Sequence, residues 1–236
     1  MNETVTRTDP QRKSAAAALL AIGAVVVALF LLVALHVLSP EYSPAWRMIS
    51  EYANGHYAWV LSLMFVAYSV SFLALAFALR SKVQGRSGRI GLAALMVAGC
   101  GAASAAVFDL NQVALHELAG VVGIVALPVA AALISRSLVR LPEWSGARRR
   151  LLWSAHLTWI SVVLWVASFV LTVVTFQIAL GALPSAPPKE VPAGVIAVVG
   201  WTNRLLVLSA WAWVVVVAWQ GLRMVFPIPF AGERDE

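Results

Sequence analysis

The residue whose chemistry is most unusual for its surroundings is Arg204, which lies well inside a long apolar stretch. A charged side chain at the centre of a bilayer costs about 2.5–3.5 kcal/mol on insertion scales unless it finds partners. We therefore expect Arg204 to face the interior of a helical bundle and to pair with a carboxylate, either Asp109 or Glu51. Two roles fit such a residue: a structural one, in which it pairs or snorkels to the interface, and a functional one, in which it lines a polar pocket.

Histidines suggest a second kind of chemistry, because imidazole and carboxylate groups bind Zn²⁺ and can activate a bound water. Such a site would draw on His36, His56, His116 and Asp109. No pair of them has a recognised metal-ligand spacing, so we predict no cofactor and keep zinc as the alternative. Ser50, His116 and Asp109 could also form a catalytic triad, but no nucleophile-elbow sequence surrounds Ser50.

Composition shows what must position these residues. The chain has 236 residues, of which 61% are hydrophobic and 12% charged, and its mean hydropathy is +0.85. A soluble domain could not bury so much apolar surface. Six runs are each long enough to cross a bilayer as a helix, which takes about 20 residues: 15–38, 57–80, 89–109, 117–136, 151–181 and 194–222. The predicted fold is an all-α bundle of six transmembrane helices.

Charge predicts the topology of that bundle. All but three of the 17 Lys and Arg residues lie at one set of run ends, and the exceptions are Arg47, Lys189 and Arg204. The positive-inside rule then places both termini in the cytoplasm of a multi-pass plasma-membrane protein. A basic pI of about 10.1 is explained by these loops and by anionic lipid, so we predict no nucleic-acid partner.

The domain boundaries follow from the same runs. We predict a disordered cytoplasmic tail over 1–14, one transmembrane domain over 15–225 and a second cytoplasmic tail over 226–236. Ser43 followed by Pro44 is typical of a helix start. It predicts a short helix over 44–53 at the outer face of the membrane.

Several short motifs resemble a known family. They are Ser50-Glu51-Tyr52 with Gly55 before the second run, Asp109 after the third, His116 at the start of the fourth, and Asn203-Arg204 followed by Trp211 and Trp213 in the sixth. Together they resemble the bacterial and archaeal membrane family called domain of unknown function 998, over about residues 15–225. The resemblance implies the six-helix layout and no known activity. A weaker similarity is to membrane hydrolases of the alkaline ceramidase type, whose paired histidines on a last helix are absent here.

The predicted site is an outward-facing polar pocket that handles lipid head groups, with the helix over 44–53 as its lid. Its residues would be Ser50, Glu51, Asp109, His116, Asn203 and Arg204. Membrane lipids are the expected partners, and the sequence is compatible with a homo-oligomer. One alternative is a metal-dependent hydrolase that acts on a lipid amide or ester at the outer leaflet. A second alternative is a small-solute transporter. The enzyme question stays open at this point.

Overall fold

The computed structural model describes residues 9–108, 112–181, 188 and 190–225. Within these ranges the chain is helical, without strands. The elements, in chain order, are α1 (Asp9–Leu38), η1 (Ile49–Asn54), α2 (Ala58–Leu79), α3 (Gly85–Val107), α4 (Val113–Leu138), η3 (Pro142–Ala147), α5 (Arg148–Leu180) and α6 (Val199–Val225), where η marks short 3₁₀ helices.

The six α-helices are each long and apolar enough to cross a membrane, which confirms the predicted number of spans and the all-α class. The largest difference is at the first helix. It begins at Asp9, inside the tail predicted to be disordered, where Lys13 Nζ lies 2.6 Å from the Asp9 carboxylate in an i,i+4 ion pair. Pro10 is compatible with this start because a helix's first turn needs no backbone N–H donors.

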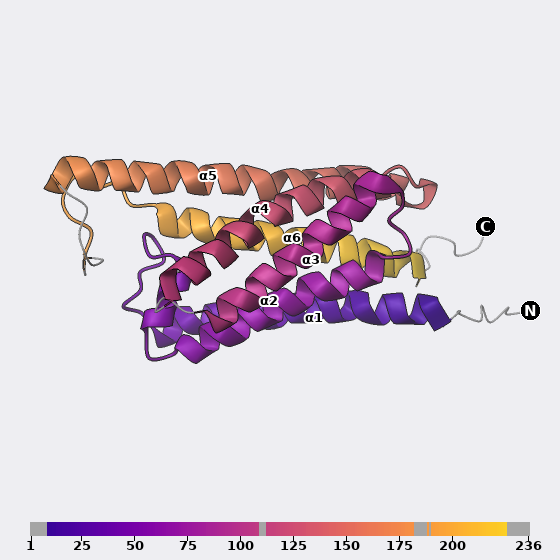
Figure 1. Ribbon diagram of the computed structural model, residues 1–236, viewed down its shortest axis with the longest axis horizontal. Helices are drawn as coiled ribbons and strands as arrows, with labels where there is room; N and C mark the ends of the chain where they lie inside the picture. The colour runs from indigo at the N-terminus through magenta and orange to yellow at the C-terminus, as the bar shows by residue number, and fades with distance from the viewer. Residues whose placement is uncertain (1–8, 109–111, 182–187, 189, 226–236) are drawn as a thin grey trace, which may run out of the picture.

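The six helices form a closed ring in chain order. Each one packs against its neighbours in the sequence, and α6 also packs against α1. Figure 1 shows that the start of α1 and the end of α6 lie at the same end of the bundle, while η1 lies at the other. We call these the basic end and the η1 end. The ring therefore has an interior that several helices can line together.

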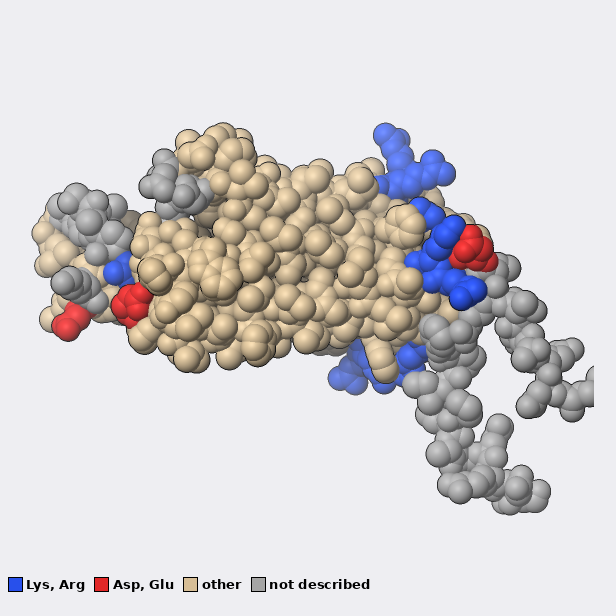
Figure 2. Space-filling model, turned by 90° about the horizontal axis from the view of Figure 1, so that it is seen from below, with Lys and Arg blue, Asp and Glu red and all other residues tan. Residues whose placement is uncertain are grey.

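The outer surface matches a lipid environment. Large apolar side chains point outward along the helices, including Phe30, Val37 and Ile178, which are 72%, 74% and 78% exposed. On the face shown in Figure 2, the middle of the molecule carries no charged side chains, and Lys and Arg gather at the basic end. The first residues of α1, α3 and α5 and the last residues of α2, α4 and α6 lie at that end. The side of the membrane that it faces stays a prediction.

Small and hydroxyl residues bring neighbouring helices close. On α5 and α6, the hydroxyls of Ser161 and Ser209 lie 2.8 Å apart, and those of Ser168 and Thr202 lie 2.5 Å apart. Gly101 of α3 sits so close to α4 that a Cβ there would lie 2.9 Å from the Ala119 carbonyl oxygen. Such contacts replace the hydrophobic effect as the force that joins helices in lipid.

The interior of the ring is solidly packed toward the basic end. Ile134, Val214 and Val217 have no exposed surface, and the Trp213 indole, also fully buried, donates a hydrogen bond of 3.0 Å to the Ser135 hydroxyl. An indole N–H in an apolar core needs such an acceptor. The interior of the ring is therefore filled where these side chains meet.

Candidate functional site

Arg204 joins three separate parts of the chain at the η1 end. Its Nε donates to His36 Nε2 of α1 at 2.8 Å, and its Nη1 donates to the Arg47 carbonyl at 2.7 Å. Nη1 also reaches the Gly200 carbonyl one turn earlier in α6, at 3.0 Å, and Nη2 donates to the Tyr52 hydroxyl of η1 at 3.3 Å. The side chain is 4% exposed, so the prediction that it faces the bundle is confirmed.

The state of His36 follows from these contacts. Its Nδ1 lies 2.6 Å from the Leu32 carbonyl, which can only accept a hydrogen bond. Nδ1 must therefore carry the ring proton, and Nε2 must be the lone pair that accepts from Arg204. His36 is neutral in this arrangement. Both of its nitrogens are engaged, which leaves no lone pair for a metal ion.

Tyr52 is also a neutral partner. Burial raises the pKa of its phenol, although the neighbouring Arg204 guanidinium partly opposes that rise, so the hydroxyl keeps its proton at neutral pH. It lies 3.5 Å from the Tyr42 carbonyl, to which it can donate, and it accepts from Arg204. The guanidinium is thus solvated by neutral acceptors, two carbonyls, an imidazole and a phenol.

One of the two expected carboxylate partners, Glu51, does not pair with Arg204. Glu51 pairs with Arg47, whose Nη1 lies 2.6 Å from Glu51 Oε2. Asp109, the other expected partner, lies outside the described residues. In place of Glu51, the loop before η1 turns the Arg47 carbonyl toward Arg204 of α6.

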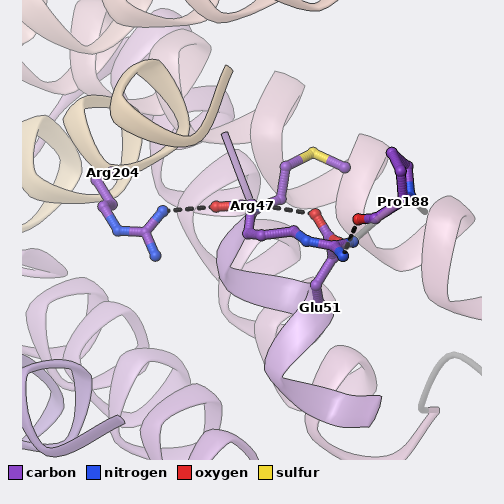
Figure 3. A network of polar contacts seen from close by, with 5 residues as sticks. Arg47, Glu51, Pro188 and Arg204 are labelled. Carbon is purple, nitrogen blue, oxygen red and sulfur yellow. Dashed lines mark hydrogen bonds and ion pairs between the residues drawn. The ribbon is translucent and has the colours of Figure 1, made fainter. Parts of the chain in front are cut away.

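Arg47 and Glu51 form an ion pair that makes further contacts of its own. Glu51 Oε1 accepts from the Met48 backbone N–H at 2.8 Å, and Arg47 Nη2 donates to the Pro188 carbonyl at 2.8 Å. The Arg47 guanidinium also stacks on the Trp46 ring, 4.1 Å from its centroid. Figure 3 shows the chain of contacts, from Arg204 to the Arg47 backbone and from the Arg47 side chain to Glu51 and Pro188.

Burial should make the Arg47–Glu51 ion pair measurably stronger than a surface ion pair. The Arg47 and Glu51 side chains are 11% and 15% exposed. A double-mutant cycle with Arg47→Met and Glu51→Gln should give a coupling energy of about 1 kcal/mol in unfolding experiments. The matched control is the Asp9–Lys13 pair, which has the same spacing and the same 2.6 Å distance, but in which Lys13 is 59% and Asp9 73% exposed. An equal coupling in both pairs would contradict the role of burial.

The loop before η1 is seated on the first turn of α6. The Ala45 carbonyl accepts from the backbone N–H groups of Gly200 and Trp201 at 3.1 and 3.3 Å, and Asn203 Oδ1 accepts from the Ile49 N–H at 2.9 Å. These contacts satisfy donors that a helix start leaves free. They also correct the predicted helix over 44–53. Carbonyl oxygens of this segment accept hydrogen bonds from α6 and not from the segment's own next turn. No helix therefore forms before Ile49, and the one that begins there is a 3₁₀ helix.

A cavity of about 370 Å³ lies beneath this loop, inside the ring. Its wall is mainly apolar and aromatic, with Phe65, Tyr68, Phe72, Trp165 and Phe169 from α2 and α5. The volume is in the range of about 300–1,000 Å³ that is usual for small-molecule sites. Polar groups enter the wall at the η1 end, namely Ser50, His116, Glu117 and Asn203.

His116 is the most buried of these polar side chains, at 8% exposed. Its Nδ1 lies 2.7 Å from the Phe108 carbonyl, across the turn between α3 and α4. A carbonyl accepts only, so Nδ1 carries a proton, and in the neutral ring Nε2 keeps a lone pair. The described residues provide no hydrogen-bond donor to Nε2. The imidazole therefore offers an oriented acceptor at the cavity wall.

The predicted site residues thus divide into two groups. Ser50, His116 and Asn203 line the cavity, whereas Glu51 and Arg204 are engaged in the contacts above it. Asp109 lies outside the described residues. His56 is exposed and contacts the Tyr57 ring. No group of three or more metal-ligating side chains occurs in the part of the chain that the structure describes, and the zinc and hydrolase alternatives stay predictions.

Comparison with known proteins identifies the family. The family model described as Protein of unknown function (DUF998) matches residues 12–220. The chain belongs to this family. The matched span contains every motif on which the resemblance was based, from Ser50 to Trp213. No curated protein and no solved structure gives a significant match to the chain.

Several cavity residues of this DUF998 protein could not be recognised from single motifs. On α5, Thr158, Val162, Trp165 and Phe169 line the cavity together. Their spacing of four, three and four residues is that of one helix face. A stripe on one face of this helix that combines a hydroxyl with aromatic residues was the available signal. Glu117, next to His116, is a polar cavity residue that was also left out of the predicted site.

Proposed function

We propose that this DUF998 protein binds a membrane amphiphile, with its alkyl chain in the cavity and its head group at the polar wall near η1. The observation that carries the proposal is the change in polarity along the wall of one cavity. The part formed by residues such as Phe72 and Leu127 is apolar, and the wall toward η1 includes His116, Glu117, Ser50 and Asn203. A lipid has the same division along its length.

The route into the cavity supports a ligand that comes from the bilayer. Val121 of α4 and Phe169 of α5 both line the cavity, yet they are 58% and 43% exposed on the outer surface. The cavity is therefore open sideways between these helices. Figure 1 shows α4 and α5 diverging toward the η1 end. An alkyl chain could enter there without leaving the hydrocarbon.

The closed floor favours binding over passage through the protein. The described cavity wall stops at Pro128 on α4, Thr158 on α5 and Val207 on α6, and Ile134, Val214 and Val217 fill the ring toward the basic end. On the positive-inside rule, the basic end is cytoplasmic and the cavity belongs to the outer half of a plasma membrane. In this proposal the loop before η1, fixed by Arg204, forms the roof of the site.

Filling the cavity should abolish binding without unfolding the protein. A Cβ added at Gly120, which lines the cavity, would meet no atom within 4 Å. Gly120→Leu should fit and should gain up to about 1 kcal/mol of helix propensity. We expect at least a tenfold loss of affinity for decanol, measured by calorimetry on the detergent-purified full chain.

The matched control for this experiment is Gly23→Leu. Gly23 lies within α1, has the same free space around its Cβ and does not line the cavity. The control should bind decanol like the wild type. If decanol binds equally well to both variants, or does not bind the wild-type protein above the micelle background, the proposed function is wrong.

A further inference from the structure

The charge at the cavity's polar wall restricts the kind of head group that it can hold. Of the described residues that line the cavity, Glu117 is the one that carries a formal charge, and none is Lys or Arg. The two nearby cations of the roof are already engaged, Arg47 with Glu51 and Arg204 with His36 and backbone carbonyls. An anionic head group would therefore meet a carboxylate with no compensating cation among the described lining residues, which is unfavourable at close range.

The hydrogen-bonding groups at the wall lead to the same conclusion. In the neutral ring, His116 Nε2 is an acceptor, because Nδ1 donates its proton to the Phe108 carbonyl. The Glu117 carboxylate only accepts. A ligand that satisfies both must donate hydrogen bonds. Ser50 and the Asn203 side-chain N–H₂ have no hydrogen bond in the described structure, so they can adjust to the rest of the head group.

Aromatic rings also line the cavity. Phe65 packs edge-on against His116, with ring centroids 6.5 Å apart, and both line the cavity. Trp165 and Phe169 line it from α5. Aromatic faces attract cations by about 0.5–2 kcal/mol, depending on desolvation. A carboxylate, an oriented imidazole acceptor and aromatic rings together match a protonated amine better than a neutral alcohol.

We infer that the cavity takes single-chain amphiphiles with a primary ammonium head group, held between the Glu117 carboxylate and His116 Nε2. This inference rests on the proposed function and adds the class of ligand. One alkyl chain is expected because the cavity volume of about 370 Å³ is near the lower limit for small-molecule sites.

The test compares three ligands of equal chain length on the full-length protein in a neutral detergent. Calorimetry with micelle-only titrations subtracted should give decylamine a Kd roughly tenfold lower than that of decanoate, with decanol between them. Glu117→Gln should weaken decylamine binding by roughly fivefold and leave decanol within twofold. Glu41→Gln is the control, because Glu41 is an exposed acid at the same end that does not line the cavity.

The outcomes separate this inference from the proposed function. If decanoate binds as tightly as decylamine, or if Glu117→Gln keeps the full preference for decylamine, the ammonium assignment is overturned. If all three ligands bind the wild type and Gly120→Leu abolishes their binding, a general amphiphile site is still supported. If no ligand binds the wild-type protein, both proposals fail. Circular dichroism of Glu117→Gln should match the wild type, since this side chain is exposed.

Discussion

Replacement of Arg204 by Met is expected to lower the free energy of unfolding by about 3 kcal/mol. The substitution keeps the length and apolar stem of the side chain but removes every N–H donor. It would leave His36 Nε2 and the Arg47 carbonyl without their donor in a region that is almost closed to water. Thermal unfolding in detergent, followed by circular dichroism, measures the effect.

Arg204→Lys should recover little of this loss. A guanidinium presents its donors in a planar fork, and here Nε, Nη1 and Nη2 each reach a different element. An ammonium group is a single point and cannot span those positions. Arg136→Met is the control, because Arg136 is an exposed cation of α4 at the basic end. Wild-type stability in Arg204→Met would show that Arg204 does not fix the roof of the cavity.

Replacement of Gly200 by Ala is the second change with a large expected effect. A Cβ at Gly200 would overlap the Pro44 carbonyl oxygen and lie 2.7 Å from the Trp46 nitrogen and 2.8 Å from the Ala45 carbonyl carbon. These are backbone atoms, so the loop itself must move away from α6. We expect a loss of about 2 kcal/mol, together with faster hydrogen exchange at the Ile49 amide, which bonds to Asn203.

Gly23→Ala provides the comparison for this substitution. Gly23 lies in the middle of α1, and a Cβ added there would have no atom within 4 Å. At this position the change should be neutral or stabilising by up to about 1 kcal/mol. If Gly200→Ala changes stability no more than Gly23→Ala does, the loop before η1 does not pack closely against Gly200 of α6.

The six spans could be predicted because hydropathy alone decides which segments enter a bilayer. Their ends were harder, since a helix can continue into polar sequence when local contacts allow it. Asp9 and Lys13 extend α1 in this way. Gly181 ends α5 with a left-handed conformation, at φ 73°, close to the predicted end of that run. The ring order of the helices is a tertiary property that hydropathy does not contain.

The candidate site was predicted in part for the same reason. The burial of Arg204 follows from its place in an apolar run, and the structure confirms it. Its partners did not follow, because two of them are carbonyls of Arg47 and Gly200, and every residue type has a carbonyl. The Arg47–Glu51 pair has the i,i+4 spacing of a known ion pair, and this spacing could have shown that Glu51 was not free for Arg204.

Photolabelling tests the central claim, a cavity that holds an alkyl chain, most directly. A long-chain alcohol with a diazirine near the end of its chain would be bound to the purified protein and irradiated, and labelled peptides would be mapped by mass spectrometry. The account predicts labels on cavity residues such as Phe72, Leu127 and Val162, which excess decanol removes. Labels confined to outward-facing residues such as Phe30 and Ile178, unchanged by excess decanol, would contradict it.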